Sequence, residues 1–302
     1  MVTSVPRSMS GPRALSMLFV GIALAAIVAV SALLAWDRPG PTSHDGGELR
    51  VYFLDVDQGD AILIQTPDSK NIMVDCGYVD YSSQVIDFLK DRGIGVIDAF
   101  IATHPDPDHI GSAPAIFEEF QVLRVYHSGF VKTTRAYLNF IEAIESEDCQ
   151  IFDDRDIDPG DLLPLSSNVT FEVLAIDSQA EDSNDASIVL RLSHGTTDII
   201  LEGDASWRTE RKMIERWGSH LDIEVLKVSH HGSSSASSTA WLEATTPETA
   251  VVCVGPNDWG LPNQSIMDRL EEAGADVLTT DGTGGVLIVV DGSDYSVTSI
   301  SV

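Results

Sequence analysis

The chain has 302 residues, 43% of them hydrophobic, which suffices for one large or two small packed domains and excludes global disorder. Its net charge is −29, from 47 acidic and 18 basic residues, with few lysines and about twice as many Asp as Glu. This charge repels nucleic acid at low ionic strength and argues against tight, nonspecific binding to it. Molar salt shortens the Debye length to about 3 Å and removes the long-range repulsion, so the charge does not exclude a nucleic-acid substrate.

The same composition predicts a surface adapted to high salt. Dense carboxylates keep such a surface hydrated, while salt screens the repulsion between them. An ordinary acidic protein is the alternative interpretation. We favour the halophilic one because the chain is rich in Asp, poor in Lys and tolerant of Arg.

The first predicted element is an apolar helix at residues 14–36, preceded by a short tail, residues 1–13, that carries two arginines. Its length fits one bilayer crossing, and the basic flank predicts that the tail stays inside and the following domain faces outside. A cleaved signal peptide is the alternative, because residues 29–31 (Ala-Val-Ser) form an acceptable cleavage site that would release a secreted protein. We favour an uncleaved membrane anchor because apolar residues continue past that site. A Pro- and Gly-rich linker follows at residues 37–47.

Residues 48–302 then form one continuous α/β domain. Short apolar or alternating segments between turn residues predict strands at 49–56, 61–66, 71–76, 96–102, 122–126, 169–176, 186–192, 197–202, 223–228, 250–254, 276–278, 285–290 and 295–300. Helical spacing of apolar residues predicts helices at 82–92, 110–120, 133–147, 206–217 and 264–273. Strands mixed with helices in this way predict sheets that are covered by helices.

The most informative segment is Thr-His-Pro-Asp-Pro-Asp-His-Ile-Gly-Ser, residues 103–112, directly after a predicted strand. Its polar side chains are those that bind divalent transition metals: His104, Asp106, Asp108 and His109. The two prolines lack backbone N–H groups and restrict the residues before them, so the loop is stiff. Asp108 could instead simply cap the next helix, but that interpretation leaves both histidines unexplained.

Two further polar clusters also follow predicted strands. Gly203-Asp204 closes the strand at 197–202, and His230-His231-Gly232-Ser233 closes the strand at 223–228. Each cluster alone is a weak signal, and Asp204 could equally be a helix cap. Their joint appearance at successive strand ends is much more specific and predicts that they share one metal site with the first loop.

The combined pattern His-x-Asp-x-Asp-His-x-Gly, Gly-Asp and His-His-Gly-Ser resembles the metallo-β-lactamase fold. Within that fold it is similar to the soluble hydrolase domain of ComEC-type competence (DNA-uptake) proteins, with supporting segments at 53–61, 74–77 and 184–190. The resemblance covers about residues 49–290. It implies an αββα sandwich, here preceded by the transmembrane helix, with a metal site at one edge of the two sheets.

The resemblance assigns the metal ligands by position: His104, Asp106, Asp108, His109, Asp204 and His230. Asp204 would bridge two ions, and His231 stays open as the alternative to His230. Asp108 and His231 would also be catalytic residues.

Three further residues would support the site from behind or beside the ligands. Asp75 would steady the His104 loop, with a buried turn aspartate as the alternative. Asp60 belongs to a loop beside the cleft, for which a plain turn is an equal interpretation, and Ser233 follows the histidine pair.

This sequence departs from the general family at the ligands and near the substrate. Asp106 replaces the family's second histidine, as in the ComEC-type branch, and residues 184–187 occupy the place of another usual ligand histidine. Asp57 stands at a typical glycine, and Leu261-Pro262 replaces Gly-His-Pro. Three carboxylates with three histidines favour two divalent ions of manganese or zinc, with magnesium as a third option.

The resemblance therefore implies a metal-dependent hydrolase that uses a metal-activated water, most specifically a phosphodiesterase or nuclease acting on single-stranded DNA. The first alternative is a hydrolase of a small phosphodiester, ester or lactone. The second is a non-catalytic membrane-anchored binding module. Lys132, Arg135 and Lys227 are candidates for substrate contacts, and the sequence predicts no oligomeric state.

Overall fold

The structure is a computed structural model that describes residues 47–301. The predicted tail, the membrane anchor and all but the last residue of the linker lie outside this part. Within residues 47–301, no helix combines the length and apolar character needed to cross a membrane.

The first sheet has eight strands in the order β16-β15-β1-β2-β3-β5-β7-β8. Their bounds are β1 Leu49–Leu54, β2 Ala61–Gln65, β3 Asn71–Cys76, β5 Ala99–Ala102, β7 Arg124–His127, β8 Gln150–Phe152, β15 Gly285–Val290 and β16 Tyr295–Ser299. Side chains alternate across this sheet, as the period of a strand requires. In β1, Val51 and Phe53 face one core, and Tyr52 and Leu54 face another.

The second sheet has six strands in the order β14-β13-β12-β11-β10-β9. Their bounds are β9 Thr170–Ala175, β10 Val189–His194, β11 Thr197–Leu201, β12 Val225–Lys227, β13 Thr249–Val252 and β14 Asp276–Thr279. A small third sheet pairs β4 (Val96–Ile97) with β6 (Gln121–Val122).

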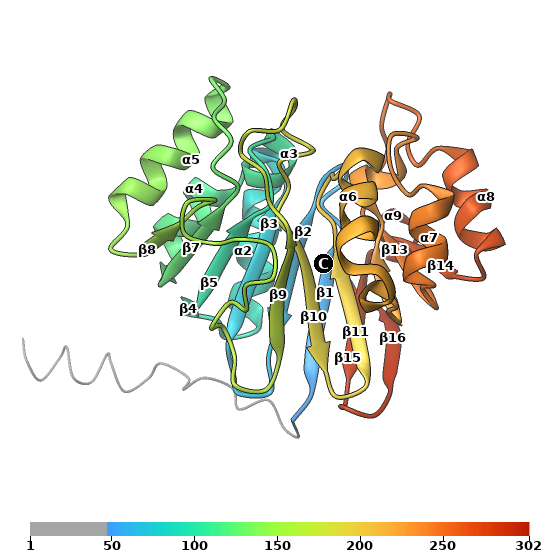
Figure 1. The fold of residues 1–302 in the computed structure, drawn as a ribbon. Coiled ribbons are helices and arrows are strands. Elements are labelled where there is room, and N and C mark those ends of the chain that lie inside the picture. Colours follow the sequence, from blue (N-terminus) through green and yellow to red (C-terminus); the bar gives the residue numbers. More distant parts are fainter. Residues whose placement is uncertain (1–46, 302) are drawn as a thin grey trace, which may run out of the picture. The chain divides into compact units, whose positions relative to one another are not determined.

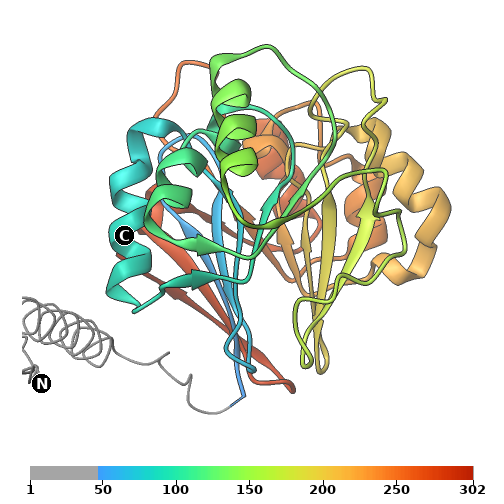
Figure 2. The same cartoon turned by 90° about the vertical axis from the view of Figure 1, so that its left-hand side faces the viewer.

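Helices cover the outer face of each large sheet (Figures 1 and 2). The helices are α2 Ser82–Asp91, α3 Pro107–Ile110, α4 Ala113–Glu119, α5 Arg135–Ser146, α6 Trp207–Trp217, α7 Thr239–Thr245, α8 Gln264–Glu272 and α9 Thr280–Thr283, with 3-10 turns η1 Val79–Tyr81, η2 Gly218–Leu221 and η3 Ser229–Gly232. One hydrophobic core lies between the sheets, a second packs α2, α4 and α5 on the first sheet, and a third packs α6, α7 and α8 on the second. The predicted αββα sandwich is therefore confirmed.

The strand directions bring several polar loops to one edge. In the first sheet β1 and β3 both run antiparallel to β2, and β5 runs parallel to β3, so these three strands end at the same side. In the second sheet β11, β12 and β13 are parallel neighbours. The carboxyl ends of parallel strands are where side chains from separate loops converge, and all the chemically informative loops follow these strands.

Most predicted elements are present, but several differ. The strand expected at 122–126 is divided between β6 and β7, the helix expected at 110–120 is divided between α3 and α4, and α9 was not predicted. The strand expected at 96–102 is broken between β4 and β5, where the buried Asp98 carboxylate accepts hydrogen bonds from the Asn71 N–H and Lys70 Nζ. Strand β8 was not predicted, because it is a short and largely exposed edge strand. Helix α7 was not predicted either, although Ser238 accepts a capping hydrogen bond from the Trp241 N–H.

Candidate metal centre

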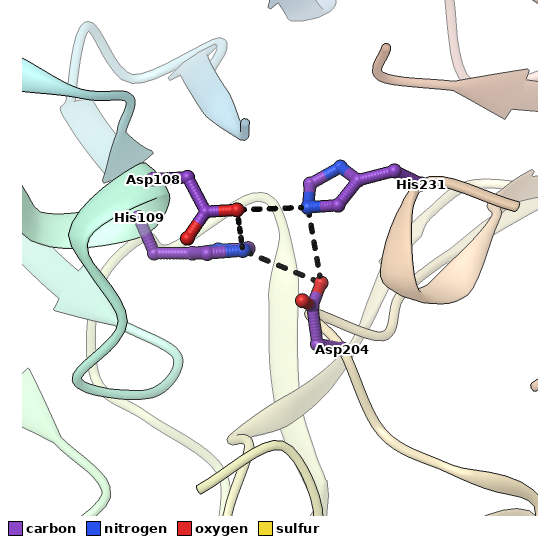
Figure 3. A group of neighbouring side chains, drawn as sticks. All are labelled: Asp108, His109, Asp204 and His231. Carbon is purple, nitrogen blue, oxygen red and sulfur yellow. Dashed lines mark ion pairs between the residues drawn. The ribbon is translucent and has the colours of Figure 1, made fainter. Parts of the chain in front are cut away.

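Four side chains from three separate segments meet at this edge (Figure 3): Asp108, His109, Asp204 and His231. Their donor atoms all lie within 4.8 Å of one another. His109 Nε2 is 3.3 Å from Asp204 Oδ1, and His231 Nε2 is 3.4 Å from Asp108 Oδ2. Asp204 Oδ1 is also 3.6 Å from His231 Nε2, so Asp204 lies between the two histidines. The structure thus brings together the loops after β5, β11 and β12.

His104 adds a third imidazole to this group. Its Nε2 is 3.7 Å from Asp204 Oδ2, and its ring centroid is 4.1 Å from that of His109. The side chain is fully buried. His104, His109 and His231 therefore surround Asp204.

The three histidines are held so that Nε2 faces the centre. His109 Nδ1 lies 2.8 Å from Asp75 Oδ2, and His231 Nδ1 lies 2.8 Å from the Cys253 carbonyl. These acceptors require a proton on Nδ1, so that the neutral imidazole has its lone pair on Nε2. His104 Nδ1 lies 3.1 Å from Thr103 Oγ1, and that hydroxyl donates to Asp75 Oδ2. Asp75 therefore orients one histidine directly and a second one through Thr103.

The inward atoms have no hydrogen-bond partner within the part of the chain that the structure describes. The Nε2 atoms of all three histidines and Oδ1 of Asp204 are buried and make no hydrogen bond there. Each buried polar atom without a partner costs about 1–3 kcal/mol, so such a cluster needs an external partner. Imidazole lone pairs mixed with carboxylates fit a divalent cation. The residues present therefore fit a metal centre.

The pKa values of the histidines also fit a cation site. Burial lowers the pKa of His104 to about 3, which keeps this imidazole neutral and able to bind a cation. Burial also opposes the charge of His109, but Asp204, Asp75 and Asp108 raise its pKa well above 6.5. His109 consequently holds a proton near neutral pH, and a cation must displace it.

A second group lies directly behind the first: Asp60, Asp75 and His109, again within 4.8 Å of one another. The two His/Asp groups are compatible with the two-metal centre that the resemblance implies. Asp75 is fully buried, and Oδ1 accepts a hydrogen bond from the Thr103 N–H at 2.8 Å. Asp60 forms a fully buried ion pair with Lys227 Nζ.

Lys227, a sequence-based candidate for substrate contacts, is fully buried and is not part of the cleft lining, so it does not reach a substrate there. Its side chain has no exposed surface, it pairs with Asp60, and it donates to the Gly203 carbonyl at 2.9 Å. Burial opposes its charge, but Asp60 and Asp204 raise the pKa of Lys227, so it stays protonated. A lysine inside an apolar strand was the available signal, because a buried charge must be paired.

Two predicted ligands lie at the border of the central group rather than within it. The Asp106 carboxylate forms an ion pair with Lys132 and is outside the central group. The structure places His231, rather than His230, in the buried group: His230 is 29% exposed, and its Nε2 is 3.8 Å from Asp204 Oδ2. His230 contacts Asn184 Nδ2 and Ser235 Oγ instead.

The interpretation of Asp108 and Asp204 as simple helix caps is wrong. Helix α3 begins at Pro107, so Asp108 lies inside its first turn. Helix α6 is capped by Ser206, whose hydroxyl accepts from the Arg208 N–H. Both carboxylates are therefore free to face the centre.

Backbone geometry brings the loop after β1 against residues 103–112, which we call the metal loop. Gly59 has φ +138°, and a Cβ there would overlap the Asp108 carbonyl. The same carbonyl accepts a hydrogen bond from the Asp60 N–H at 3.2 Å. Only glycine at position 59 permits this close approach between the loop after β1 and the Asp108 carbonyl.

Asp57 stands at the position where the family has glycine. It has φ +59°, a conformation that Asp tolerates better than most residues.

A cleft of about 320 Å³ opens onto the centre. It is lined by Gln58, Tyr78, Asp108, His230, His231, Ser233, Ser234, Trp259, Leu261 and Asn263. Ser233, predicted to support the site, lies on the cleft wall, and its hydroxyl is 3.0 Å from Ser235 Oγ. Neither Lys132 nor Arg135 is part of this lining.

The fold and the convergent donor set define the class: the chain belongs to the metallo-beta-lactamase superfamily, whose family model matches residues 54–255. The metallo-beta-lactamase fold protein YhfI from Bacillus subtilis has a similar structure, with a TM-score of 0.56 and 13% identity over 80% of this chain and 100% of that chain. At this identity the likeness concerns the fold alone.

Three competence or recombination proteins are distant relatives. The chain is 29% identical over 259 residues to ComE operon protein 3 of Bacillus subtilis, covering 79% of this chain and 33% of that protein. It is 26% identical over 249 residues to competence protein ComA of Neisseria gonorrhoeae, covering 82% and 33%. Recombination protein 2 of Haemophilus influenzae is 27% identical over 248 residues, covering 79% and 28%. The resemblance to competence proteins is thus confirmed, and the chain spans about a third of the length of these relatives.

Proposed function

We propose that this chain is a metal-dependent phosphodiesterase that cleaves single-stranded nucleic acid, with DNA as the leading substrate. The observation that carries the proposal is the set of inward-facing, partnerless Nε2 atoms of His104, His109 and His231 around Asp204. They lie beside a cleft that solvent can enter. A buried donor set of this kind serves either structure or chemistry, and the adjacent cleft favours chemistry.

The cations would be held by the three imidazoles with Asp108 and Asp204. When bound, two divalent ions would lower the pKa of a water and stabilise negative charge on a phosphoryl oxygen. Manganese suits a carboxylate-containing set, and zinc competes through its higher intrinsic affinity. Asp106 would join the set only if Lys132 released it.

The surrounding residues would keep this arrangement fixed. Asp75 and the Cys253 carbonyl hold the imidazoles in one tautomer, which is the usual means of orienting histidine ligands. The Lys227–Asp60 pair lies beneath the centre and limits its negative charge when no cation is bound. His230, on the cleft wall, is placed to contact a substrate.

The nucleic-acid substrate is supported by the competence relatives, and only indirectly, because the chain covers about a third of each. A small phosphodiester is the second candidate. The observation that favours it is the size of the cleft, about 320 Å³, which is close to the lower end of small-molecule sites.

We further propose that residues 14–36 anchor the domain at the outer face of a membrane. The apolar length and the basic flank of this segment support the proposal. Mass-spectrometric identification of the mature N-terminus tests it, because cleavage after residue 31 would indicate secretion instead.

The activity test uses labelled single-stranded DNA and the metal-loaded protein at high salt. We expect cleavage with manganese, loss of cleavage with chelator, and loss in Asp108→Asn. The matched control is Asp98→Asn, which alters another buried carboxylate that lies outside the metal centre and should retain cleavage. Turnover of a small phosphodiester without cleavage of DNA would favour the second candidate, and no turnover of either would refute the proposal.

A further inference from the structure

Two exposed tryptophans border the segment that carries the histidine pair. Trp259 is 66% exposed and Trp207 is 45% exposed, whereas Trp241 is fully buried and Trp217 is half-buried. A large exposed indole is unfavourable in water, so two of them beside one site indicate a binding role. Both lie close to Ser233–Ser235, which we call the serine loop.

The serine loop connects the two tryptophans to the cleft. Trp259 lines the cleft together with Ser233 and Ser234. The Trp207 backbone N–H donates to the Ser235 carbonyl at 2.9 Å. Ser235 in turn contacts His230, since its hydroxyl lies 3.0 Å from Nδ1 of that ring. The serine loop therefore connects the cleft, which Trp259 lines, to the start of α6, where the exposed Trp207 lies.

The backbone of the loop that carries Trp259 is ordered by its own hydrogen bonds. The Asn257 side chain ties its loop together: Oδ1 accepts from the N–H groups of Trp259 and Leu261, both at 3.1 Å. Nδ2 of the same residue donates to the Gly255 and Leu261 carbonyls, both at 2.8 Å. A preorganised loop backbone loses little conformational entropy when the aromatic side chain that it carries binds a ligand.

Trp207 lies at the start of a basic helix. Helix α6 carries four of the chain's 18 basic residues, although the net charge is −29: Arg208, Arg211, Lys212 and Arg216. The Arg208 guanidinium is 5.1 Å from the Trp207 ring centroid, and that of Arg211 is 5.7 Å away. Positive charge is therefore concentrated around the second indole.

The ion pairs of these basic residues do not account for the cluster. Lys212 Nζ pairs with Asp177 at 3.1 Å. Arg211 is 3.9 Å from Glu215, with both side chains more than 60% exposed, and Arg208 is 3.9 Å from Asp185. The exposed Arg211–Glu215 pair contributes at most about 1 kcal/mol and exchanges readily for another anion. Asp185 is buried, but the Arg208 side chain is 49% exposed and still presents donors to solvent. Guanidinium groups bind phosphate in two-point geometry, which a water-exposed pair leaves available.

We propose that Trp259, the serine loop and the Trp207–Arg208–Arg211 surface form a binding track for single-stranded nucleic acid that leads through the cleft. Bases stack on the two indoles, and phosphates contact the two arginines. The track deepens the proposed phosphodiesterase function and rests on it, because it names a polynucleotide, rather than a small phosphodiester, as the substrate. It also explains how an acidic protein binds a polyanion, since stacking is not screened by salt.

The test measures binding separately from cleavage. Full-length protein is first freed of metal with chelator. It is then titrated into a labelled oligothymidylate of about 12 nucleotides, and the fluorescence anisotropy of the label reports binding. A thymidine dinucleotide is the short comparison. The native protein should bind the longer ligand more tightly and show quenching of its tryptophan emission. Trp259→Ala and Trp207→Ala should each weaken binding of the oligonucleotide roughly 5- to 100-fold and reduce the quenching.

Charge reversal tests the other half of the track. Arg208→Glu combined with Arg211→Glu should weaken binding roughly tenfold at low salt and less at molar salt, because salt screens ion pairs but not stacking. Arg155→Glu is the matched control, because Arg155 is 83% exposed and lies outside the track. Thermal unfolding of each variant verifies that it is folded.

The outcomes separate the two proposals. If the native protein binds and cleaves DNA while the tryptophan variants bind as tightly as native, the track is wrong and the nuclease function stands. If Arg155→Glu weakens binding as much as the α6 variant, the effect is general charge and the track is again wrong. If the native protein neither binds nor cleaves DNA, the nuclease function fails and the track fails with it.

Discussion

Replacing Asp75 by Asn would test whether the metal centre depends on the carboxylate behind it. Asp75 Oδ2 accepts from Thr103 Oγ1 at 2.6 Å and from His109 Nδ1 at 2.8 Å, and Oδ1 accepts from the Thr103 N–H at 2.8 Å. Asn has the same shape but offers one acceptor atom in place of two. It also tolerates the left-handed backbone of this position, φ +56°, so the substitution adds no backbone strain.

The expected effect on metal binding and stability depends on which of the two Asp75 oxygens the amide nitrogen of Asn replaces. If the nitrogen faces His109, the imidazole must carry its proton on Nε2 and can no longer bind a cation through that atom. If it faces the Thr103 N–H, two donors oppose each other in a fully buried place, which costs about 1–3 kcal/mol of unfolding free energy. Loss of a supporting carboxylate typically weakens metal binding 10- to 100-fold, or about 1.4–2.8 kcal/mol.

Calorimetric titration of manganese into the metal-free protein at high salt measures this loss, and urea unfolding measures stability in parallel. Asp98→Asn is the control, because its carboxylate also accepts from backbone and side chain, the Asn71 N–H at 3.0 Å and Lys70 Nζ at 2.9 Å. Asp98 precedes β5, whereas the metal loop follows it, so Asp98→Asn should lose stability and keep its manganese affinity. Manganese binding by Asp75→Asn within twofold of native, or equal weakening by both variants, would refute the reasoning.

Four shorter predictions follow from other parts of the molecule. Gly59→Ala should lower both stability and manganese affinity, because its Cβ would push against the Asp108 carbonyl; unchanged affinity by calorimetry would contradict this. His231→Gln should weaken metal binding at least tenfold more than His230→Gln, since only His231 has a buried, partnerless Nε2; the reverse order in the same titration would exchange their roles. Burial raises the pKa of Asp68, but hydrogen bonds from neighbouring hydroxyl and N–H groups outweigh it and lower the pKa below 3.8, so the stabilisation is complete above the unfolded-state value and is lost as pH falls. Asp68→Asn should therefore lose unfolding free energy at pH 7, with a gap that narrows in acid; a constant gap would count against the assignment. Finally, raising potassium chloride toward molar concentration should raise the melting temperature of the native protein, and a flat or falling curve would argue against the halophilic interpretation.

Local sequence patterns determined much of the fold. The alternation of apolar residues predicted β3 with its observed bounds, and helical spacing predicted α8 to within one residue. These patterns are reliable because each records, residue by residue, which side of an element faces a core. Strand β8 was not predicted because its residues are largely exposed, so they do not show the apolar pattern of a buried strand.

The metal loop at residues 103–112 could also be predicted from the sequence, because its metal-capable side chains are adjacent and no core position requires them. The sequence could not predict which histidine of the neighbouring pair faces inward. His230 and His231 both have left-handed backbone conformations, φ +48° and +53°, and the choice between them follows from the Cys253 carbonyl at the end of β13.

Long-range contacts decided the rest of the site. Asp106 lies in the same short loop as the other ligands, yet its carboxylate pairs with Lys132, which comes from a different loop. Lys227 pairs with Asp60 across the two sheets, so its burial depends on how those sheets pack. The sequence by itself determined which residues could bind a metal, because that depends on side-chain chemistry and local spacing. Only the tertiary structure decided which of them converge, because convergence depends on where the ends of distant strands meet.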